Sequence, residues 1–406
     1  PTPGPATPTP APTPAPTPGP TPGTMVCTPV CNIYTQDHLK QFLTTSPGDI
    51  SGKLAGPLVI TSPYSADIST TKYLDGSGFT ISQSSAVSTS YDQHSSVQFF
   101  NNYQTETEPS YTLFKTDSSL TLHNLTVSGF HGNNIKIIDS SGLYLGLSGC
   151  TFRDNSVNQH IFVEGSQNVT DICNSLFSFV SSSKNGGAIT SYGKTLSIYD
   201  SSFISNSSST SGGAIYSQNE ITISGGSTFA HNHATGEGGG GALYAAKGGI
   251  NLDGSSTFLD NSAYVGGALY TGISGVTLLT GPYEFSGNHA TNGPGGAIYS
   301  MNDITISGET ESTFAHNHAS GPGGALYAAK GGINLDGSST FLENSAHSGG
   351  ALAANGGITL NNKAYSEFSG NKADTLGGAI FAGNTLIIDS SLTTFSGNAA
   401  LDGSNI

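Results

Sequence analysis

The sequence predicts an all-β fold, a right-handed single-stranded parallel β-helix with about 27 residues per coil. Two recurring motifs predict it: Phe-x-x-Asn recurs along 152–398, and Gly-Gly-Ala-(Ile/Leu) recurs between its copies along 186–380. Each period therefore holds three short alternating strands and no helix, as expected of one coil of a solenoid. The chain has 55 glycines among 406 residues but no Gly-X-Y period, which indicates a turn-rich repeat and excludes collagen.

The repeat also predicts the interior of the solenoid. Coils of equal length stack at about 4.8 Å, so each motif residue is expected above its counterpart in the next coil. The phenylalanines would form an apolar column, and the inward asparagines would bond the backbone at a bend and the asparagine above. The expected phenylalanine column is Phe203, Phe229, Phe258, Phe285, Phe314, Phe341, Phe368 and Phe395. The expected asparagine column is Asn206, Asn232, Asn261, Asn288, Asn317, Asn344, Asn371 and Asn398. A degenerate coil around Phe177 is expected to fill the gap after Phe152.

Three regions follow from the motif boundaries and composition. Residues 1–25 are a Pro/Thr-rich extended arm, 26–120 an N-terminal cap with the first irregular coils, and 121–406 the repeated β-helix. In the cap, Thr35 is expected to begin a short amphipathic helix that covers the first coil. The apolar face of this helix would consist of Leu39, Phe42 and Leu43.

The arm is expected to adopt polyproline II, which would reach about 75 Å if straight. Two interpretations stay open, a plain linker or stalk and an O-glycosylated arm in which alternating Thr and Pro hold hydroxyls outward. The possible O-glycosylation sites are Thr7, Thr9, Thr13, Thr17 and Thr21.

The charge balance excludes some classes of partner. The chain has 27 acidic and 12 basic residues and a formal net charge of -15, so it repels phosphate backbones and favours no nucleic-acid partner. Arg153 is the sole arginine. No apolar run approaches the roughly 20 residues of a membrane-spanning helix, so the chain is expected not to span a membrane. The composition is typical of an exported protein.

The four cysteines predict two disulfides in an oxidising compartment. Cys150 and Cys173 lie about one coil apart, so they would staple adjacent coils. Cys27 and Cys31 would close a tight loop between arm and cap. Neither pair has the spacing of a zinc ribbon.

The histidines and tyrosines suggest surface features. His231 and His233 flank one column asparagine, His316 and His318 flank another, and His289 occupies the position of His233. We expect an exposed imidazole row, interpreted as a solvated face inherited by duplication, with surface zinc as the less favoured alternative. The tyrosines that follow the Gly-Gly-Ala motif form either a stacked ladder that stabilises the sheet or an exposed strip that binds a ligand. They are Tyr216, Tyr244, Tyr270, Tyr299 and Tyr327.

No catalytic residue, cofactor or metal site is predicted. Asp253 and Asp336 lie in Asp-Gly-Ser segments that are expected to be turns, because the calcium-binding nonapeptide pattern is absent. Polysaccharide-cleaving β-helices need clustered aspartates with basic residues, whereas the acidic residues here are scattered.

The pairing of Phe-x-x-Asn with Gly-Gly-Ala-(Ile/Leu) resembles the repeats of the chlamydial polymorphic membrane protein family. The resemblance covers about Phe152 to Asn398. It implies a β-helical passenger of an autotransported adhesin at the bacterial cell surface or outside the cell. The Pro/Thr arm is not part of the family pattern.

Three functional hypotheses follow. The first is a structural or adhesive surface protein that joins other copies of itself head-to-tail into a filament, a contact suggested by a last coil without a polar cap. The second is a monomeric adhesin passenger that binds a host receptor or glycan on a flat β-face. The third, a pectate-lyase-like polysaccharide-active enzyme, is least favoured, so we expect the protein not to be an enzyme.

Overall fold

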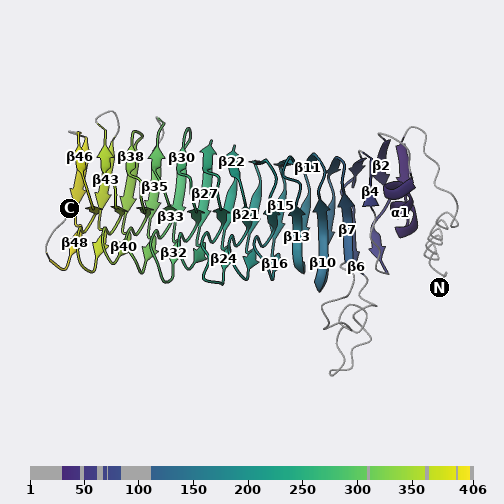
Figure 1. Ribbon diagram of the computed structural model, residues 1–406, viewed down its shortest axis with the longest axis horizontal. Helices are drawn as coiled ribbons and strands as arrows, with labels where there is room; N and C mark the ends of the chain where they lie inside the picture. Colours follow the sequence, from purple (N-terminus) through teal and green to yellow (C-terminus); the bar gives the residue numbers. More distant parts are fainter. Residues whose placement is uncertain are drawn as a thin grey trace, which may run out of the picture.

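The computed structural model describes residues 30–45, 50–61, 67–70, 72–83, 111–308, 311–361, 365–389 and 392–402. Within them the chain winds into a long rod of stacked parallel β-strands, with its first coils at one end and its last at the other (Figure 1). The predicted all-β parallel solenoid is confirmed. The Pro/Thr arm, Cys27 and the threonines proposed for O-glycosylation lie outside the described residues.

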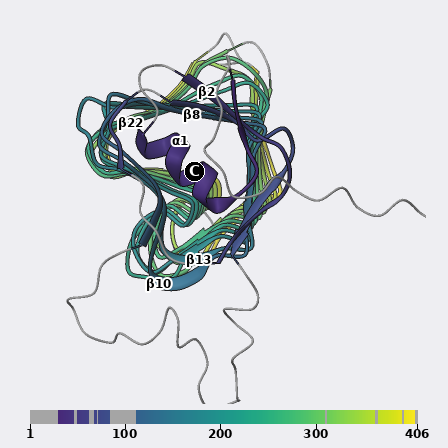
Figure 2. The ribbon, with the colours of Figure 1, turned by 90° about the vertical axis from the view of Figure 1, so that its right-hand side faces the viewer.

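The helix α1 (Gln36–Thr45) covers the first coil (Figure 2). Thr35 caps it, because its Oγ1 accepts a hydrogen bond from the backbone N–H of His38 at 3.1 Å. Leu39 and Phe42, on the inner side of this helix, are fully buried. Phe42 lies so close to Gly52 that a Cβ there would come within 2.8 Å of its ring. The helix thus closes the apolar interior at this end.

The first face of the rod is a 14-stranded parallel sheet. Its strands, in order, are β1 (Val30–Ile33), β2 (Ile50–Leu54), β5 (Lys72–Asp75), β8 (Leu120–His123), β11 (Tyr144–Ser148), β14 (Val169–Cys173), β18 (Thr195–Tyr199), β22 (Glu220–Ser224), β26 (Ile250–Asp253), β30 (Val276–Leu278), β34 (Ile304–Ile306), β38 (Ile333–Leu335), β42 (Ile358–Leu360) and β46 (Leu386–Ile388).

The second face is a 13-stranded parallel sheet. Its strands are β3 (Leu58–Ile60), β6 (Thr80–Gln83), β9 (Thr126–Ser128), β12 (Thr151–Arg153), β15 (Leu176–Ser178), β19 (Ser202–Ile204), β23 (Thr228–Ala230), β27 (Ser256–Leu259), β31 (Tyr283–Ser286), β35 (Ser312–Ala315), β39 (Ser339–Leu342), β43 (Ser366–Ser369) and β47 (Thr393–Ser396).

The third face bends. Early coils cross it with one strand each, namely β4 (Asp67–Ile68), β7 (Tyr111–Thr116), β10 (His131–Ser140) and β13 (Ser156–Val163). From there two short strands replace the single one, since β13 pairs with both β16 and β17. The short strands are β16 (Ser181–Ser182), β17 (Ile189–Ser191), β20 (Ser207–Ser208), β21 (Ile215–Ser217), β24 (His233–Ala234), β25 (Leu243–Ala245), β28 (Ser262–Ala263), β29 (Leu269–Thr271), β32 (His289–Ala290), β33 (Ile298–Ser300), β36 (His318–Ala319), β37 (Leu326–Ala328), β40 (Ser345–Ala346), β41 (Leu352–Ala354), β44 (Lys372–Ala373), β45 (Ile380–Ala382) and β48 (Ala399–Ala400).

The Gly-Gly-Ala motif makes the bend on this face. Its first glycine, Gly240 for example, has a φ of 68°, a region that costs other residues energy. At its second glycine, Gly241, a Cβ would lie 2.1 Å from the carbonyl oxygen of Gly267 in the next coil. The motif therefore recurs because the corner demands both a left-handed backbone and close approach between coils.

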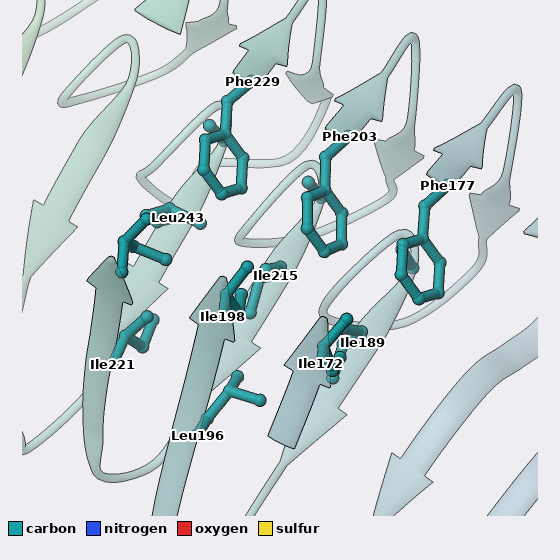
Figure 3. Packing of buried hydrophobic residues seen from close by; sticks show 14 of the residues in the cluster. Ile172, Phe177, Ile189, Leu196, Ile198, Phe203, Ile215, Ile221, Phe229 and Leu243 are labelled. Atoms are coloured by element: carbon teal, nitrogen blue, oxygen red, sulfur yellow. The ribbon is translucent and has the colours of Figure 1, made fainter. Parts of the chain in front are cut away.

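The inner side chains form continuous columns along the rod. Successive phenylalanine rings from Phe203 to Phe395 stack nearly parallel, with centroids 4.6 to 5.0 Å apart. Figure 3 shows Phe177, Phe203 and Phe229 one behind another beside aliphatic side chains from the other two faces. Phe177 also stacks on Phe152 at 5.0 Å, so the degenerate coil continues the same column.

The asparagines form a second, polar column. The Nδ2 of Asn232 donates to the carbonyl oxygen of Phe203 at 2.9 Å and to the Oδ1 of Asn261 at 3.0 Å. That Oδ1 also accepts the backbone N–H of Asn232. The pattern repeats from Asn206 through to Asn398. Each amide thus satisfies backbone groups that the bend removes from the sheet.

The polar column is interrupted at Val180, which occupies the asparagine position of the degenerate coil. On the far side of this break, the Nδ2 of Asn155 lies 3.0 Å from the Nε2 of His160 and also donates to the carbonyl of Val127. His160 is fully buried, its Nδ1 has no hydrogen-bond partner, and burial lowers its pKa to about 3. The imidazole of His160 is therefore buried in its neutral form inside the rod.

His160 should make the rod sensitive to acid. Its pKa is lower in the folded protein than in the unfolded chain, so the unfolded chain binds the extra proton. The free energy of unfolding is highest above the unfolded pKa of about 6.5. It falls by up to about 1.4 kcal/mol per pH unit as the pH drops towards 3. The loss of melting temperature between pH 7 and pH 4.5 should therefore be smaller in His160→Leu than in the parent, whereas exposed His347→Leu should change nothing. Equal acid sensitivity in all three proteins would refute the assignment.

Candidate functional site

The predicted disulfide between Cys150 and Cys173 is wrong, because both thiols are free. Near these residues the coil repeats every 25 positions: Cys173 pairs with Ser148, and the N–H of Cys150 bonds the Oγ of Ser175. The two cysteines are thus out of register. Burial raises the pKa of the Cys150 thiol to about 11, so it is a poor nucleophile. Cys31 is disulfide-bonded, and its pairing with Cys27 stays a prediction.

The tyrosines of β21, β25, β29, β33 and β37 form one ladder on the third face, stacked from Tyr216 to Tyr299 and tilted by 39° between Tyr299 and Tyr327. Ring centroids lie 5.2, 4.6, 4.7 and 5.6 Å apart from the first ring to the last. We call Tyr216, Tyr244, Tyr270, Tyr299 and Tyr327 the tyrosine ladder. Each member pairs in register with the next. The ladder ends on both sides. In the coil before Tyr216 the registered residue is Thr190, and in the coil after Tyr327 it is Ala353.

The ladder is half-buried because it packs on the glycine-rich loops. A Cβ at Gly239 would lie 2.4 Å from the ring of Tyr270, so only glycine leaves room for that ring. Burial raises the pKa of Tyr244 and of Tyr299 to about 12, so their phenols stay protonated at neutral pH. Both faces of the central rings Tyr244 and Tyr270 are covered by neighbouring rings, so these tyrosines present ring edges and hydroxyls. It offers an uncharged strip of hydrogen-bonding groups rather than open faces for stacking a sugar.

The histidines lie at the opposite side of the third face, where the second face ends. The residue before each column asparagine has a left-handed backbone, and His231 has a φ of 55° and His316 a φ of 56°. His231 Nδ1 lies 3.7 Å from an oxygen of Asp260, and His316 Nδ1 lies 3.5 Å from Glu343, each in the next coil. All four side chains are more than half exposed. Such exposed pairs contribute little stability.

The residues after the column asparagines form an outward row that is not a continuous imidazole row. In register it runs His233, Ser262, His289, His318 and Ser345. His233 Nδ1 lies 2.6 Å from the Oγ of Ser262, and His318 Nδ1 lies 2.9 Å from the Oγ of Ser345. His289 and His318 are adjacent, with ring centroids 4.9 Å apart. Serine interrupts the expected row, and one imidazole pair is left.

A longer repeat of three coils explains this pattern, although the motifs of single coils do not reveal it. An identical segment occurs at 241–259 and 324–342, and the pentapeptide Ala-His-Asn-His-Ala occurs at 230–234 and 315–319. Three registered steps separate Phe258 from Phe341, so the copies lie three coils apart. Comparing every third motif instead of every motif would have revealed it. The surface of the rod is therefore patterned in units of three coils.

Two hollows in the described part of the rod have linings with little catalytic chemistry. One of about 420 Å³ lies beside the start of α1, with Asp37 as its acidic side chain. Another of about 310 Å³ lies at the last described coil, among Leu376, Phe381 and Leu386. Among the residues described, no three His, Cys, Asp or Glu side chains gather closely enough to hold a metal ion. Neither hollow contains a paired-carboxylate arrangement.

Comparison with known proteins gives one match. The Chlamydia polymorphic membrane protein repeat matches residues 200–218, 282–301 and 365–383, so the chain carries repeats of that type. The matches recur every third coil, with the period of the longer repeat. No curated protein and no solved structure matches the chain. None of the described helices is long and apolar enough to cross a membrane.

Proposed function

We propose that the chain is a surface-exposed repeat protein whose stiff solenoid displays an adhesive face to other cells. The repeat family supports surface exposure. The observation that carries the proposal is the unbroken stacking of the phenylalanine column from Phe152 to Phe395, which makes the described coils one rod with a fixed outer surface. Such a rod holds side chains in register over a long distance, as multivalent adhesion requires.

The tyrosine ladder is the surface that best fits an adhesive role. Tyrosine is enriched at protein interfaces because its ring buries apolar area while its hydroxyl keeps a partner. The ladder is already ordered by stacking, so it loses little side-chain entropy when a partner binds. Its edges and hydroxyls suit a host protein receptor, or a glycan held by hydrogen bonds. Of the structural and adhesive roles proposed for a surface protein, we therefore favour adhesion.

The other hypotheses have less support. Head-to-tail assembly would require the last coil of one copy to join the first coil of another, but α1 covers that first coil through Leu39 and Phe42. O-glycosylation of the arm concerns residues outside the described ranges. A polysaccharide-active enzyme would need clustered carboxylates, and the two hollows supply none. The supported proposal is a non-enzymatic display rod.

Adhesion can be measured with beads that carry the purified protein. We expect saturable binding to cultured epithelial cells, inhibited by soluble protein. The double variant Tyr270→Ser/Tyr299→Ser should lower bead binding about tenfold, because it removes two central members of the tyrosine ladder, a loss of about 1.4 kcal/mol. Thr305→Ala on the outer side of β34 is the matched control and should bind like the parent.

The outcomes separate the proposal from its rivals. Circular dichroism must first show that the double variant is folded. Beads that fail to bind any of a panel of host cells would overturn the adhesive role. Equal binding by the parent and the double variant would keep adhesion but remove the tyrosine ladder from it.

A further inference from the structure

We propose that His289 and His318 together bind a divalent transition-metal ion, Cu²⁺ most tightly and Zn²⁺ or Ni²⁺ less tightly. The two side chains project outward from β32 and β36, whose residues pair directly in register. Neutral imidazole is a preferred ligand of these ions, and the order of affinity follows the Irving–Williams series. Solvent would complete the coordination sphere, because the described chain contributes no third ligand here.

The separation of the rings fits a chelate. With a metal–nitrogen bond of about 2.0–2.1 Å, the metal lies about 3.2 Å from each ring centroid, so cis angles of about 90–109° place the centroids about 4.5–5.2 Å apart. The observed centroid separation is 4.9 Å. The spacing of the coils fixes this value, and the site needs no backbone movement. The rings are tilted by 51° and are not stacked flat.

Ser345 in the next coil orients the imidazole of His318 for metal binding. Nδ1 of His318 lies 2.9 Å from the Oγ of Ser345. When that nitrogen carries the proton and donates to the hydroxyl, the lone pair stays on Nε2, where a metal can take it. Such an outer partner is what metal-binding histidines usually have. Within the described residues His289 has no hydrogen bond through either ring nitrogen, so no protein group competes for its lone pairs.

The surroundings of the pair disfavour a positive charge on His289. Partial burial lowers the pKa of His289, and the charge of a protonated His318 lowers it further. Adjacent in the row are Ser262 on the earlier coil and Ser345 on the later one, and neither is charged. Because protons and metal ions compete for the same imidazole nitrogens, binding should weaken as the pH falls.

The same row contains its own control. His233 follows a column asparagine and precedes an alanine, as His289 and His318 do, but its neighbour in the next coil is Ser262. Two coils, or about 9.6 Å, separate His233 from His289, which is too far for one ion to bridge. Serine already occupies this position in β28 and β40, so a His→Ser change is one that the fold accommodates.

Isothermal titration of the protein with Cu²⁺ and with Zn²⁺ tests the proposal, with Mg²⁺ as a negative control. We expect one site that is lost in His289→Ser and in His318→Ser and kept in His233→Ser. Electron paramagnetic resonance of the Cu²⁺ complex should show two imidazole nitrogens in the parent and fewer in either variant of the pair. Ser345→Ala should weaken binding about tenfold, as expected for loss of an outer hydrogen bond.

A variant designed to gain a metal site provides a second test. Ser262→His would place four imidazoles in consecutive coils, and the stoichiometry of Cu²⁺ binding should rise. The proposal is overturned if His289→Ser binds as the parent does, or if His233→Ser loses as much affinity as the variants of the pair. It is also overturned if Ser262→His leaves the stoichiometry unchanged. These readouts do not depend on adhesion.

Discussion

Replacing Phe258 with alanine should lower the free energy of unfolding by about 3–5 kcal/mol. The side chain is fully buried, and its ring lies 4.9 Å from that of Phe229 and 4.6 Å from that of Phe285. Truncation leaves a cavity that cannot collapse, because backbone pairing with both neighbouring coils fixes the height of each strand. Denaturant unfolding followed by circular dichroism measures the loss, and hydrogen exchange should place it in the coils around β27.

Phe179 supplies a matched aromatic control for this effect. It is 63% exposed and has a left-handed backbone with a φ of 53°. Phe179→Gly removes a ring of the same size but relieves backbone strain, so stability should stay within about 1 kcal/mol of the parent. If both substitutions cost the same, the phenylalanine column would not be the main source of stability. A solenoid can unfold in segments, so hydrogen exchange is needed beside the global curve.

Most of the fold could be predicted because the two motifs fix the register. A side chain that recurs once per coil must stack on its copies, and Phe and Asn at a fixed separation set the phase of every strand. The N-terminal helix could also be predicted, because Thr35 and the spacing of apolar residues after it are local sequence signals. The fold was harder to predict in coils where the motifs are degenerate. Val180 replaces an asparagine, so neither the break in the polar column nor the buried His160 beside it left a recurring signal.

The errors in the predicted site have physical causes. A disulfide depends on register to within one residue, and Cys150 and Cys173 miss each other by two positions although they lie in adjacent coils. The imidazole row was expected from motifs compared coil by coil, whereas the surface repeats every three coils. Serine at positions 262 and 345 therefore separates the histidines, and only the junction of two units brings His289 next to His318.

Replacing Asn288 with alanine should cost about 3–5 kcal/mol, from several buried groups left unpaired at about 1–3 kcal/mol each. The Oδ1 of Asn288 accepts both the backbone N–H and the Nδ2–H of Asn261. Its own Nδ2 donates to the carbonyl of Phe258 at 3.0 Å and to Asn317 at 2.9 Å. No water can replace these bonds in a closed interior. Thermal unfolding measures the effect, and Asn251→Ala on the outer side of β26 should be nearly neutral.

Asn288→Asp separates lost hydrogen bonds from lost volume, because the side chains are the same size. An aspartate at this position can still accept both bonds from Asn261 but directs an oxygen at the carbonyl of Phe258. Burial and that carbonyl raise its pKa in the folded protein above the unfolded value of about 3.9. The folded state then binds the extra proton, so the variant should gain stability relative to the parent as the pH falls through the raised pKa. A variant as stable as the parent at pH 7 would show that the donor at Nδ2 is dispensable. Recovery in acid would show that this donor holds one coil to the next.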